Sequence, residues 1–249
     1  MNGSLALQGV SLGYEREPAV RRLDAAFAAG SLTALVGPNG AGKTTLLKGL
    51  VGELKPLEGR IDLPARDVAY LPQQSAIDRS FPITVTELVA MGLWGRLGAF
   101  GGVTRTHRRR IAEALAAVGL TGFERRSIAT LSGGQMQRVL FARLLLQEAD
   151  VLLLDEPFTA IDTRTASDLL GIISRWHREG KTIIAVLHDL ETVRMHFPRA
   201  LLLARDLVAH GDTHSVLTAE NLMQARQMCE ACAGPEHSCG RPVVTTWRT

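Results

Sequence analysis

Nine consecutive residues near the start of the chain combine glycines, a lysine and two hydroxyl groups. Residues 37–45 read Gly-Pro-Asn-Gly-Ala-Gly-Lys-Thr-Thr and fit the phosphate-loop pattern G-x-x-x-x-G-K-[ST]. Glycines let backbone N–H groups turn toward phosphate oxygens, because no Cβ atom obstructs them. In this pattern Lys43 reaches the β- and γ-phosphates, and the Thr44 hydroxyl ligates Mg²⁺. We therefore expect a nucleoside triphosphate to bind at Gly37, Pro38, Asn39, Gly40, Ala41, Gly42, Lys43, Thr44 and Thr45.

An apolar run at residues 151–154 ends in two acids, Asp155 and Glu156. A buried parallel strand delivers such residues to its carboxyl end, the sheet edge at which ligands bind. There Asp155 can hold Mg²⁺ directly or through water, and Glu156 can polarise the attacking water as a general base. The alternative is that both acids only cap the next helix, but the phosphate loop upstream favours the nucleotide role.

Two flanking elements position the phosphate loop. Residues 32–36 form an apolar run typical of a buried strand, and residues 46–50 begin a helix. Because the loop joins them, the first N–H groups of the helix face the bound anion. Residues 25–27 and 32–36 flank Gly30 and predict a hairpin that leads into the loop.

Strand and helix patterns alternate along most of the chain and predict an α/β fold with a largely parallel sheet. The exception is about residues 84–132, where three helical pieces follow one another without a strand. We expect this stretch to be a helical subdomain inserted into an ATPase domain that covers residues 1–218. Beyond residue 218 the pattern weakens, and residues 219–249 are expected to form a C-terminal tail.

A third motif, Leu-Ser-Gly-Gly-Gln, occupies residues 131–135. With it, the chain resembles the ATP-binding cassette (ABC) ATPases over about residues 4–215, because every motif of that family occurs in the expected order. The resemblance implies a P-loop core with a parallel sheet, an antiparallel β subdomain and an inserted helical subdomain. It also implies ATP and Mg²⁺ as ligands and ATP hydrolysis as the activity.

The resemblance also assigns roles outside the first two motifs. Tyr14 is expected to stack on adenine. Gln73 is expected to be the Q-loop glutamine near Mg²⁺, with Gln74 as the alternative, and His188 the switch histidine at the γ-phosphate. Gln73 and His188 thus join the general base as expected catalytic residues, and Asp162 resembles the D-loop aspartate. The signature residues are Ser132, Gly133, Gly134 and Gln135.

A serine and two glycines at a helix N-terminus form an anion site. In the family, this site closes over the γ-phosphate that a second cassette holds. We therefore expect an ATP-dependent head-to-tail homodimer that encloses two ATP molecules. Gln73 lies where the α/β core meets the helical insert, so it is expected to relay the state of the nucleotide to whatever docks there.

Three classes of ABC protein fit a stand-alone cassette to different degrees. A DNA-repair or chromosome ATPase needs a long coiled coil between Lys43 and the signature, and fewer than ninety residues separate them. A ribosome-associated factor normally carries two cassettes, and this chain has one set of motifs. A transporter ATPase that pairs with a separate membrane permease fits best. The net charge of +3 gives no indication of nucleic-acid binding.

The cargo is indicated by residues 72–92, which resemble the corresponding stretch of zinc- and manganese-type metal importers. An iron-chelate or haem importer is the alternative. An importer implies a permease and an extracytoplasmic metal-binding protein. The sequence shows no secretion signal and no apolar stretch near the roughly 18–20 residues that span a bilayer. We expect a peripheral protein on the cytoplasmic face of the plasma membrane, held there by the permease.

All three cysteines lie in the last 21 residues. Cys229, Cys232, His237 and Cys239 supply four soft ligands at a spacing suited to tetrahedral Zn²⁺. The family core does not require them. The alternative is a tail with incidental cysteines.

Overall fold

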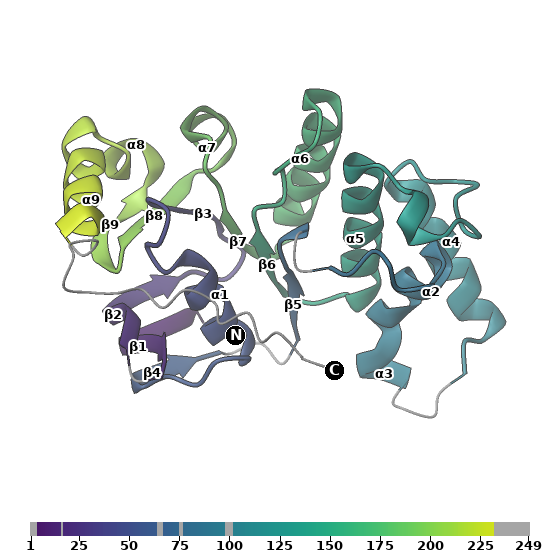
Figure 1. The fold of residues 1–249 in the computed structure, drawn as a ribbon, viewed down its shortest axis with the longest axis horizontal. Coiled ribbons are helices and arrows are strands. Elements are labelled where there is room, and N and C mark those ends of the chain that lie inside the picture. Colours follow the sequence, from purple (N-terminus) through teal and green to yellow (C-terminus); the bar gives the residue numbers. More distant parts are fainter. Residues whose placement is uncertain (1–3, 16, 64–66, 75–76, 98–101, 232–249) are drawn as a thin grey trace, which may run out of the picture.

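The computed structural model describes residues 4–15, 17–63, 67–74, 77–97 and 102–231. Short apolar segments form a central six-stranded sheet in the order β5-β6-β7-β3-β8-β9 (Figure 1). Neighbouring strands from β5 to β8 are parallel, and β9 is antiparallel to β8. The strands are β3 (Leu32–Val36), β5 (Val68–Leu71), β6 (Val151–Asp155), β7 (Thr182–Val186), β8 (Arg199–Ala204) and β9 (Asp206–Asp212).

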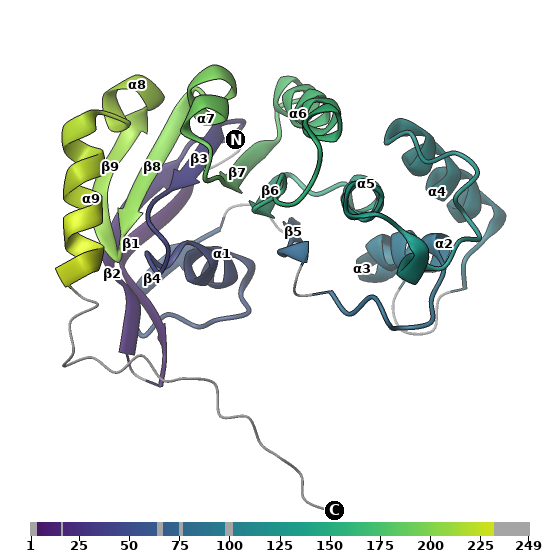
Figure 2. The same cartoon turned by 45° about the horizontal axis from the view of Figure 1, so that its top comes forward.

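Every residue of β3, β6 and β7 is buried, because helices cover one face of this sheet and a helix and second sheet cover the other. Helix α1 (Lys43–Val51) packs on one face through Leu46, Leu47 and Leu50. The opposite face is covered by α6 (Thr163–Arg178), α7 (Leu190–His196), α8 (Thr213–Val216) and α9 (Ala219–Ala231), as Figure 2 shows. The α/β fold with a largely parallel sheet is thus confirmed.

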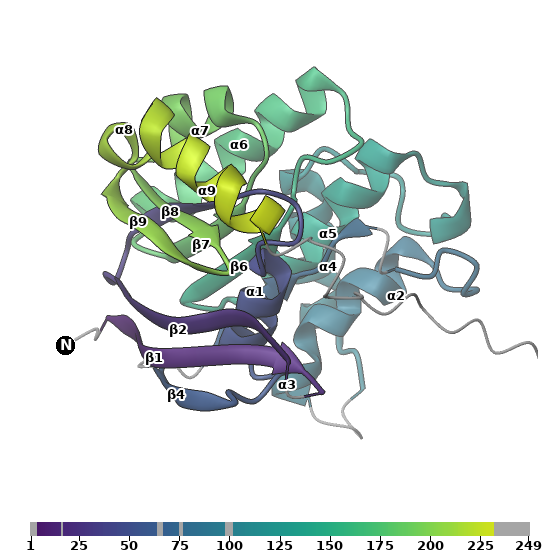
Figure 3. The ribbon, with the colours of Figure 1, turned by 60° about the vertical axis from the view of Figure 1, so that its left-hand side comes forward.

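A second sheet lies beneath α1 in the order β2-β1-β4 and is entirely antiparallel (Figure 3). Its strands are β1 (Leu5–Tyr14), β2 (Glu17–Phe27) and β4 (Glu58–Asp62). The hairpin predicted around Gly30 is wrong, because β2 pairs with β1 whereas β3 pairs with β7 and β8. The short turn between β2 and β3 therefore carries the chain from one sheet to the other.

The helical subdomain extends from one end of the central sheet (Figure 1). Within the expected residues 84–132 its elements are α2 (Val85–Ala90), the 3-10 helix η2 (Met91–Leu93), α3 (Trp94–Leu97), α4 (Arg105–Ala117) and the 3-10 helix η3 (Ile128–Thr130). Helix α5 (Gly133–Gln147) lies beyond that stretch but packs with these helices. Apolar residues of α2 and α4 pack against α5, among them Leu88, Leu115 and Leu140. Helix α5 leads into β6, so this subdomain is joined to the strand that ends in Asp155, the residue before Glu156.

Helix α9 follows α8, where the sequence pattern weakens. It is attached to the central sheet through the buried Ala225, with Met228 and Cys229 packed against the same core. Among the helices of the described part of the chain, none combines the length and apolar character needed to cross a lipid bilayer.

Candidate nucleotide site

The phosphate loop connects β3 to α1 and lies against β8. Gly42 occupies the N-cap position of α1 with φ 91°, and no side chain caps the first turn, which leaves N–H groups for an anion. A Cβ atom on Gly37 would lie 2.0 Å from the carbonyl oxygen of Leu203, so this approach requires glycine. The N–H of Arg205 donates to the carbonyl oxygen of Ala41 at 3.0 Å. The loop is therefore held against the end of β8 and the residue that follows it.

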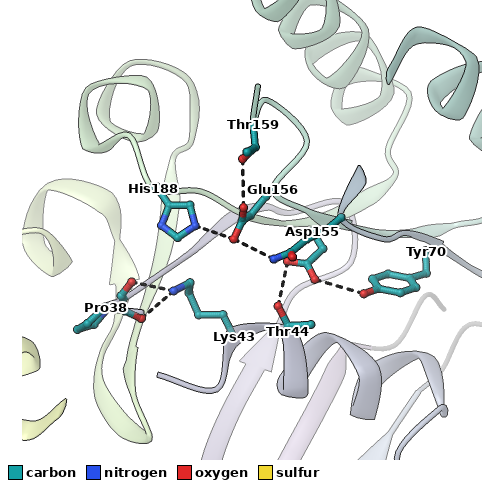
Figure 4. Close-up of polar contacts among 10 residues, drawn as sticks. Pro38, Lys43, Thr44, Tyr70, Asp155, Glu156, Thr159 and His188 are labelled. Atoms are coloured by element: carbon teal, nitrogen blue, oxygen red, sulfur yellow. Dashed lines mark hydrogen bonds and ion pairs between the residues drawn. The ribbon is translucent and has the colours of Figure 1, made fainter. Parts of the chain in front are cut away.

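Asn39 and Gly40 are exposed at the tip of the loop, whereas Lys43 is only 6% exposed. The Nζ atom of Lys43 donates to the carbonyl oxygens of Gly37 at 2.9 Å and Pro38 at 2.8 Å (Figure 4). Burial lowers the pKa of Lys43, while the charges of Glu156 and Asp155 oppose that shift. The ammonium group of Lys43 thus bonds to carbonyl oxygens of the same loop that is expected to bind the phosphates.

Thr44 and Asp155 meet across the start of α1 and the end of β6. The Thr44 hydroxyl donates to Asp155 Oδ1 at 3.3 Å, and the Tyr70 hydroxyl donates to Oδ2 at 3.3 Å. Asp155 is 1% exposed, and burial raises the pKa of its carboxyl group. A buried carboxylate beside a hydroxyl is a donor set that suits Mg²⁺, because the cation would offset the buried negative charge. These residues therefore fit the predicted metal.

The carboxylate of Glu156 lies at the centre of the polar contacts in Figure 4. Its Oε1 atom is 2.9 Å from Gln73 Nε2 and 2.7 Å from His188 Nε2, and its Oε2 accepts from the Thr159 hydroxyl at 3.1 Å. The backbone of Glu156 is left-handed, with φ 50°, a conformation that costs free energy in a residue other than glycine. Three side chains and the backbone together fix the direction of the carboxylate.

Gln73 and Gln74 make different contacts. Gln73 bonds to Glu156, whereas Gln74 Nε2 donates to the Gly133 carbonyl at 2.7 Å and to Gln137 Oε1 at 3.0 Å. Gln74 thus points toward the start of α5. Of the two alternatives for the Q-loop position, Gln73 is the one next to the acidic pair.

Ser132 caps α5, the helix that begins with the signature glycines. The Gln135 N–H donates to Ser132 Oγ at 3.2 Å, and the Ser132 N–H donates to Gln135 Oε1 at 3.0 Å. The predicted helix N-terminus is present. The side chains of Ser132 and Gln135 each accept a hydrogen bond from the other residue's backbone N–H. A Cβ atom on Gly134 would lie 3.4 Å from Asp162 Oδ2, so the signature and Asp162 are neighbours within one chain.

Comparison with known proteins shows the family to which the chain belongs. The sequence model of the family described as "ABC transporter" matches residues 20–159. The chain belongs to the ABC transporter family. It is 38% identical to the manganese transport system ATP-binding protein MntB of Listeria monocytogenes, over 89% of this chain and 95% of that protein. It is also 38% identical to the zinc transport system ATP-binding protein TroB of Treponema pallidum, over 89% and 86%.

Among solved structures, the ABC cassette is similar to a protein described as a metal-chelate type ABC transporter in an inward-facing conformation. The TM-score is 0.82 at 28% identity, and the match covers 91% of this chain and 90% of the other. As a member of the family, the chain is an ATPase that binds ATP with Mg²⁺ and hydrolyses it to power transport. Cassettes of such transport systems form dimers and work with a membrane permease.

Three other predicted residues, Tyr14, Asp162 and Cys229, lie in the described part of the chain. Tyr14 is 53% exposed at the end of β1, and its hydroxyl accepts from Lys48 Nζ at 3.4 Å. Asp162 caps α6 by accepting from the N–H and hydroxyl of Thr165, and these bonds lower the pKa of its carboxyl group. Cys229 is half-buried in α9, and Cys232, His237 and Cys239 lie outside the described residues.

Tyr70 and Thr159 each bond one of the two acids, although no sequence motif marks them. Neither belongs to a motif with distinctive spacing. The strand alternation is the one sequence feature that could have indicated Tyr70. It lies between the buried Ala69 and Leu71 near the end of β5, so its side chain faces the other side of the strand. Thr159 lies three residues after Glu156. This spacing is common for hydroxyl residues in turns, so it does not indicate a functional role.

Proposed function

We propose that this ABC ATPase energises the import of a divalent metal ion, manganese or zinc, through a separate permease. The observation that carries this proposal is 38% identity to a manganese and to a zinc transport ATP-binding protein over 86% or more of every chain compared. A second candidate is import of a metal chelate, which the similarity to the metal-chelate type transporter favours. The permease would hold the cassette at the cytoplasmic face of the membrane, and an extracytoplasmic protein would deliver the metal.

The proposed mechanism uses the side chains around the phosphate loop. Lys43 and the first N–H groups of α1 would bind the β- and γ-phosphates, and Thr44 and Asp155 would hold Mg²⁺, which would neutralise charge on the phosphates. Glu156 accepts a proton from the attacking water while Gln73 and His188 hold its carboxylate in place. The support for these roles is that the side chains of Gln73 and His188 both lie within 2.9 Å of Glu156 Oε1.

The signature residues are proposed to act on a second copy of the chain. Ser132 and its helix would contact the γ-phosphate held by that copy, so that the dimer is head-to-tail and depends on ATP. The N-terminal position of Ser132 on α5 supports this role, since helix N-termini favour anions.

Radioactive metal uptake tests the proposed function. Cells that depend on this chain should accumulate ⁵⁴Mn²⁺ or ⁶⁵Zn²⁺, and accumulation should stop when the chain is deleted. Accumulation of an iron chelate but of neither free ion would instead establish the second candidate. Uptake of all three that is unchanged by deletion would contradict both.

Replacing Gln73 with alanine is expected to uncouple transport from hydrolysis. Its amide bonds to Glu156 and also lines the cleft that separates the α/β core from the helical subdomain. Transport should fall by about tenfold or more, the size of a typical coupling free energy, while ATP affinity changes by about threefold or less. Uptake per ATP hydrolysed in proteoliposomes measures this. Gln74→Ala is the matched control, and equal uncoupling by both variants would remove the special role of Gln73.

The tail is proposed to bind one Zn²⁺ per chain through Cys229, Cys232, His237 and Cys239, with the thiols ionised on binding. Zinc bound there would then slow further import. We expect stoichiometric zinc in the purified protein, lost in a Cys229/Cys232→Ser double variant, together with loss of inhibition of the ATPase by free zinc. Absence of zinc from the unmodified protein would end this proposal, and zinc loss without a change in inhibition would leave a structural role.

A further inference from the structure

Tyr70 reaches from β5 to the end of the neighbouring strand. In the register of these parallel strands Tyr70 lies beside Leu153, and Asp155 is two residues further along β6. Residues two apart in a strand share a face of the sheet, so the side chain of Asp155 is the diagonal neighbour of Tyr70 on that face. An aromatic side chain spans such a diagonal, and the Tyr70 hydroxyl donates to Asp155 Oδ2 at 3.3 Å. A serine or threonine in this position would be too short to make the bond.

Packing fixes the direction in which Tyr70 extends. Its ring is half-buried and packs against the core cluster that contains Leu50 of α1 and Leu153 of β6. Ala69 and Leu71, on either side of it in β5, are buried in the core on the opposite face. Since successive side chains of a strand alternate between faces, the Tyr70 hydroxyl extends along the side of the sheet that α1 covers.

The carboxylate of Asp155 bonds to hydroxyl groups from two elements (Figure 4). Thr44, the second residue of α1, donates to Oδ1 at 3.3 Å, and Tyr70 of β5 donates to Oδ2 at the same distance. Oδ1 therefore lies beside the other side chain that is expected to ligate Mg²⁺, whereas Oδ2 is held from β5. Because the two bonds reach different oxygen atoms, they restrain the rotation of the carboxylate more than either bond would alone.

Burial makes the bond from Tyr70 difficult to replace. Asp155 is 1% exposed, so solvent water has little access to its oxygen atoms. Burial raises the pKa of Asp155, and the bonds from Thr44 and Tyr70 oppose that shift because they stabilise the charged carboxylate. Burial and the charge of Asp155 also raise the pKa of Tyr70, so its hydroxyl keeps the proton that it donates.

Packing alone does not require the hydroxyl group of Tyr70. Phenylalanine would bury the same ring against the same cluster without the cost of removing a polar group from water. The hydroxyl is therefore expected to serve the residue to which it bonds, and that residue is a predicted ligand of Mg²⁺. Residues that hydrogen-bond a metal ligand orient it, and their loss typically lowers metal affinity by about 10- to 100-fold.

We propose that Tyr70 is a positioning residue for Mg²⁺, because its hydroxyl holds Asp155 Oδ2 so that Oδ1 stays beside Thr44. This inference rests on the proposed roles of Thr44 and Asp155 in holding the cation. Tyr70 would act on metal affinity through Asp155, without being needed for the binding of ATP itself.

Binding of Mn²⁺ to the complex of the chain with ATP tests this role without a measurement of activity. Mn²⁺ takes the same kinds of oxygen ligand as Mg²⁺, and the electron paramagnetic resonance signal of free Mn²⁺ falls when the ion binds. Glu156→Gln serves as the background, because ATP should stay intact in it. The protein is kept in excess over ATP so that the nucleotide is bound, and the Mn²⁺ that binds without ATP is subtracted.

Tyr70→Phe in this background should raise the Mn²⁺ concentration at half-saturation by about tenfold. The affinity for a fluorescent ATP analogue in EDTA should change by about twofold or less, because the proposed role concerns the metal. Thr33→Val is the matched control, since it removes a buried hydroxyl of β3 whose oxygen has no hydrogen-bond partner in the described part of the chain. That control should leave the Mn²⁺ affinity unchanged. Equal losses of Mn²⁺ affinity and of metal-free ATP affinity in Tyr70→Phe would indicate a general disturbance of the site and overturn the inference.

A double variant shows whether Tyr70 acts through Asp155. Asp155→Asn should itself weaken Mn²⁺ binding, and the addition of Tyr70→Phe should cause little further loss, since the carboxylate that Tyr70 positions is then absent. A further loss of about tenfold in the Asp155→Asn background would mean that Tyr70 acts on another group, and it would overturn the inference.

The remaining outcomes separate the inference from the function on which it rests. Unchanged Mn²⁺ affinity in Tyr70→Phe, with weaker binding in Asp155→Asn, would overturn the role of Tyr70 and leave that of Asp155 standing. Unchanged affinity in Asp155→Asn would remove the proposed metal ligand, and the inference would fail with it. Replacement of Tyr70 by 4-aminophenylalanine restores an N–H donor at the same position and should recover part of the lost affinity. A loss that this replacement does not reduce would contradict the role of the hydrogen bond.

Discussion

Glu156→Gln should bind ATP and hydrolyse it about 10² to 10⁴ times more slowly than the unmodified chain. The amide has nearly the shape of the carboxylate but cannot accept a proton from water. It would keep contacts to Gln73, His188 and Thr159, so the site should remain assembled. Since hydrolysis would no longer open the dimer, the variant should accumulate as an ATP-bound dimer. Phosphate release and size-exclusion chromatography with ATP measure the two effects.

The control for this prediction is Glu179→Gln, which makes the same chemical change at an exposed position after α6. That variant should hydrolyse ATP at the normal rate and elute as the unmodified chain does. If Glu156→Gln hydrolyses ATP at the normal rate, Glu156 is not the general base.

Lys43→Ala should lose nucleotide binding rather than turnover alone. Charge-assisted hydrogen bonds contribute about 1.5–3 kcal/mol each, so loss of contacts to two phosphates should lower ATP affinity by about 100-fold or more. The variant would also lose the two bonds by which Nζ holds the loop carbonyls of Gly37 and Pro38. Titration with a fluorescent ATP analogue measures the affinity.

Lys55→Ala is the matched control, because it removes an exposed lysine after the end of α1. Its ATP affinity should match that of the unmodified chain. A similar affinity in Lys43→Ala would mean that the loop backbone alone binds the phosphates and that Lys43 acts only later, in the transition state.

The phosphate loop and the acidic strand could be predicted from sequence because their chemistry depends on local backbone geometry. The glycines of residues 37–42 require a strand before the loop and a helix start after it. The apolar run before Asp155 requires a buried strand, and neither requirement depends on distant parts of the chain. The pairing of β2 could not be predicted, since Phe27 and Leu32 are close in sequence but belong to different sheets. Strand pairing depends on distant partners, which periodicity does not identify.

The choice between Gln73 and Gln74 also depended on distant residues. The two side chains are identical and adjacent, and only the positions of Glu156 and Gly133 distinguish them. Helix α9 had a weak pattern because little of it is fully buried: Ala225 is 1% exposed, whereas Met223 is 62% exposed. Its position depends on contact with β8 more than on its own periodicity.

The left-handed backbone of Glu156 has a consequence for how this protein can evolve. Such a conformation costs of order 1–3 kcal/mol in a residue other than glycine, and asparagine and glycine tolerate it best. Substitutions to those residues would relax the chain while removing the carboxylate. Selection for thermal stability alone would therefore favour inactive sequences at this position. A thermostable variant of this cassette must therefore gain stability at other positions and keep the left-handed backbone of Glu156.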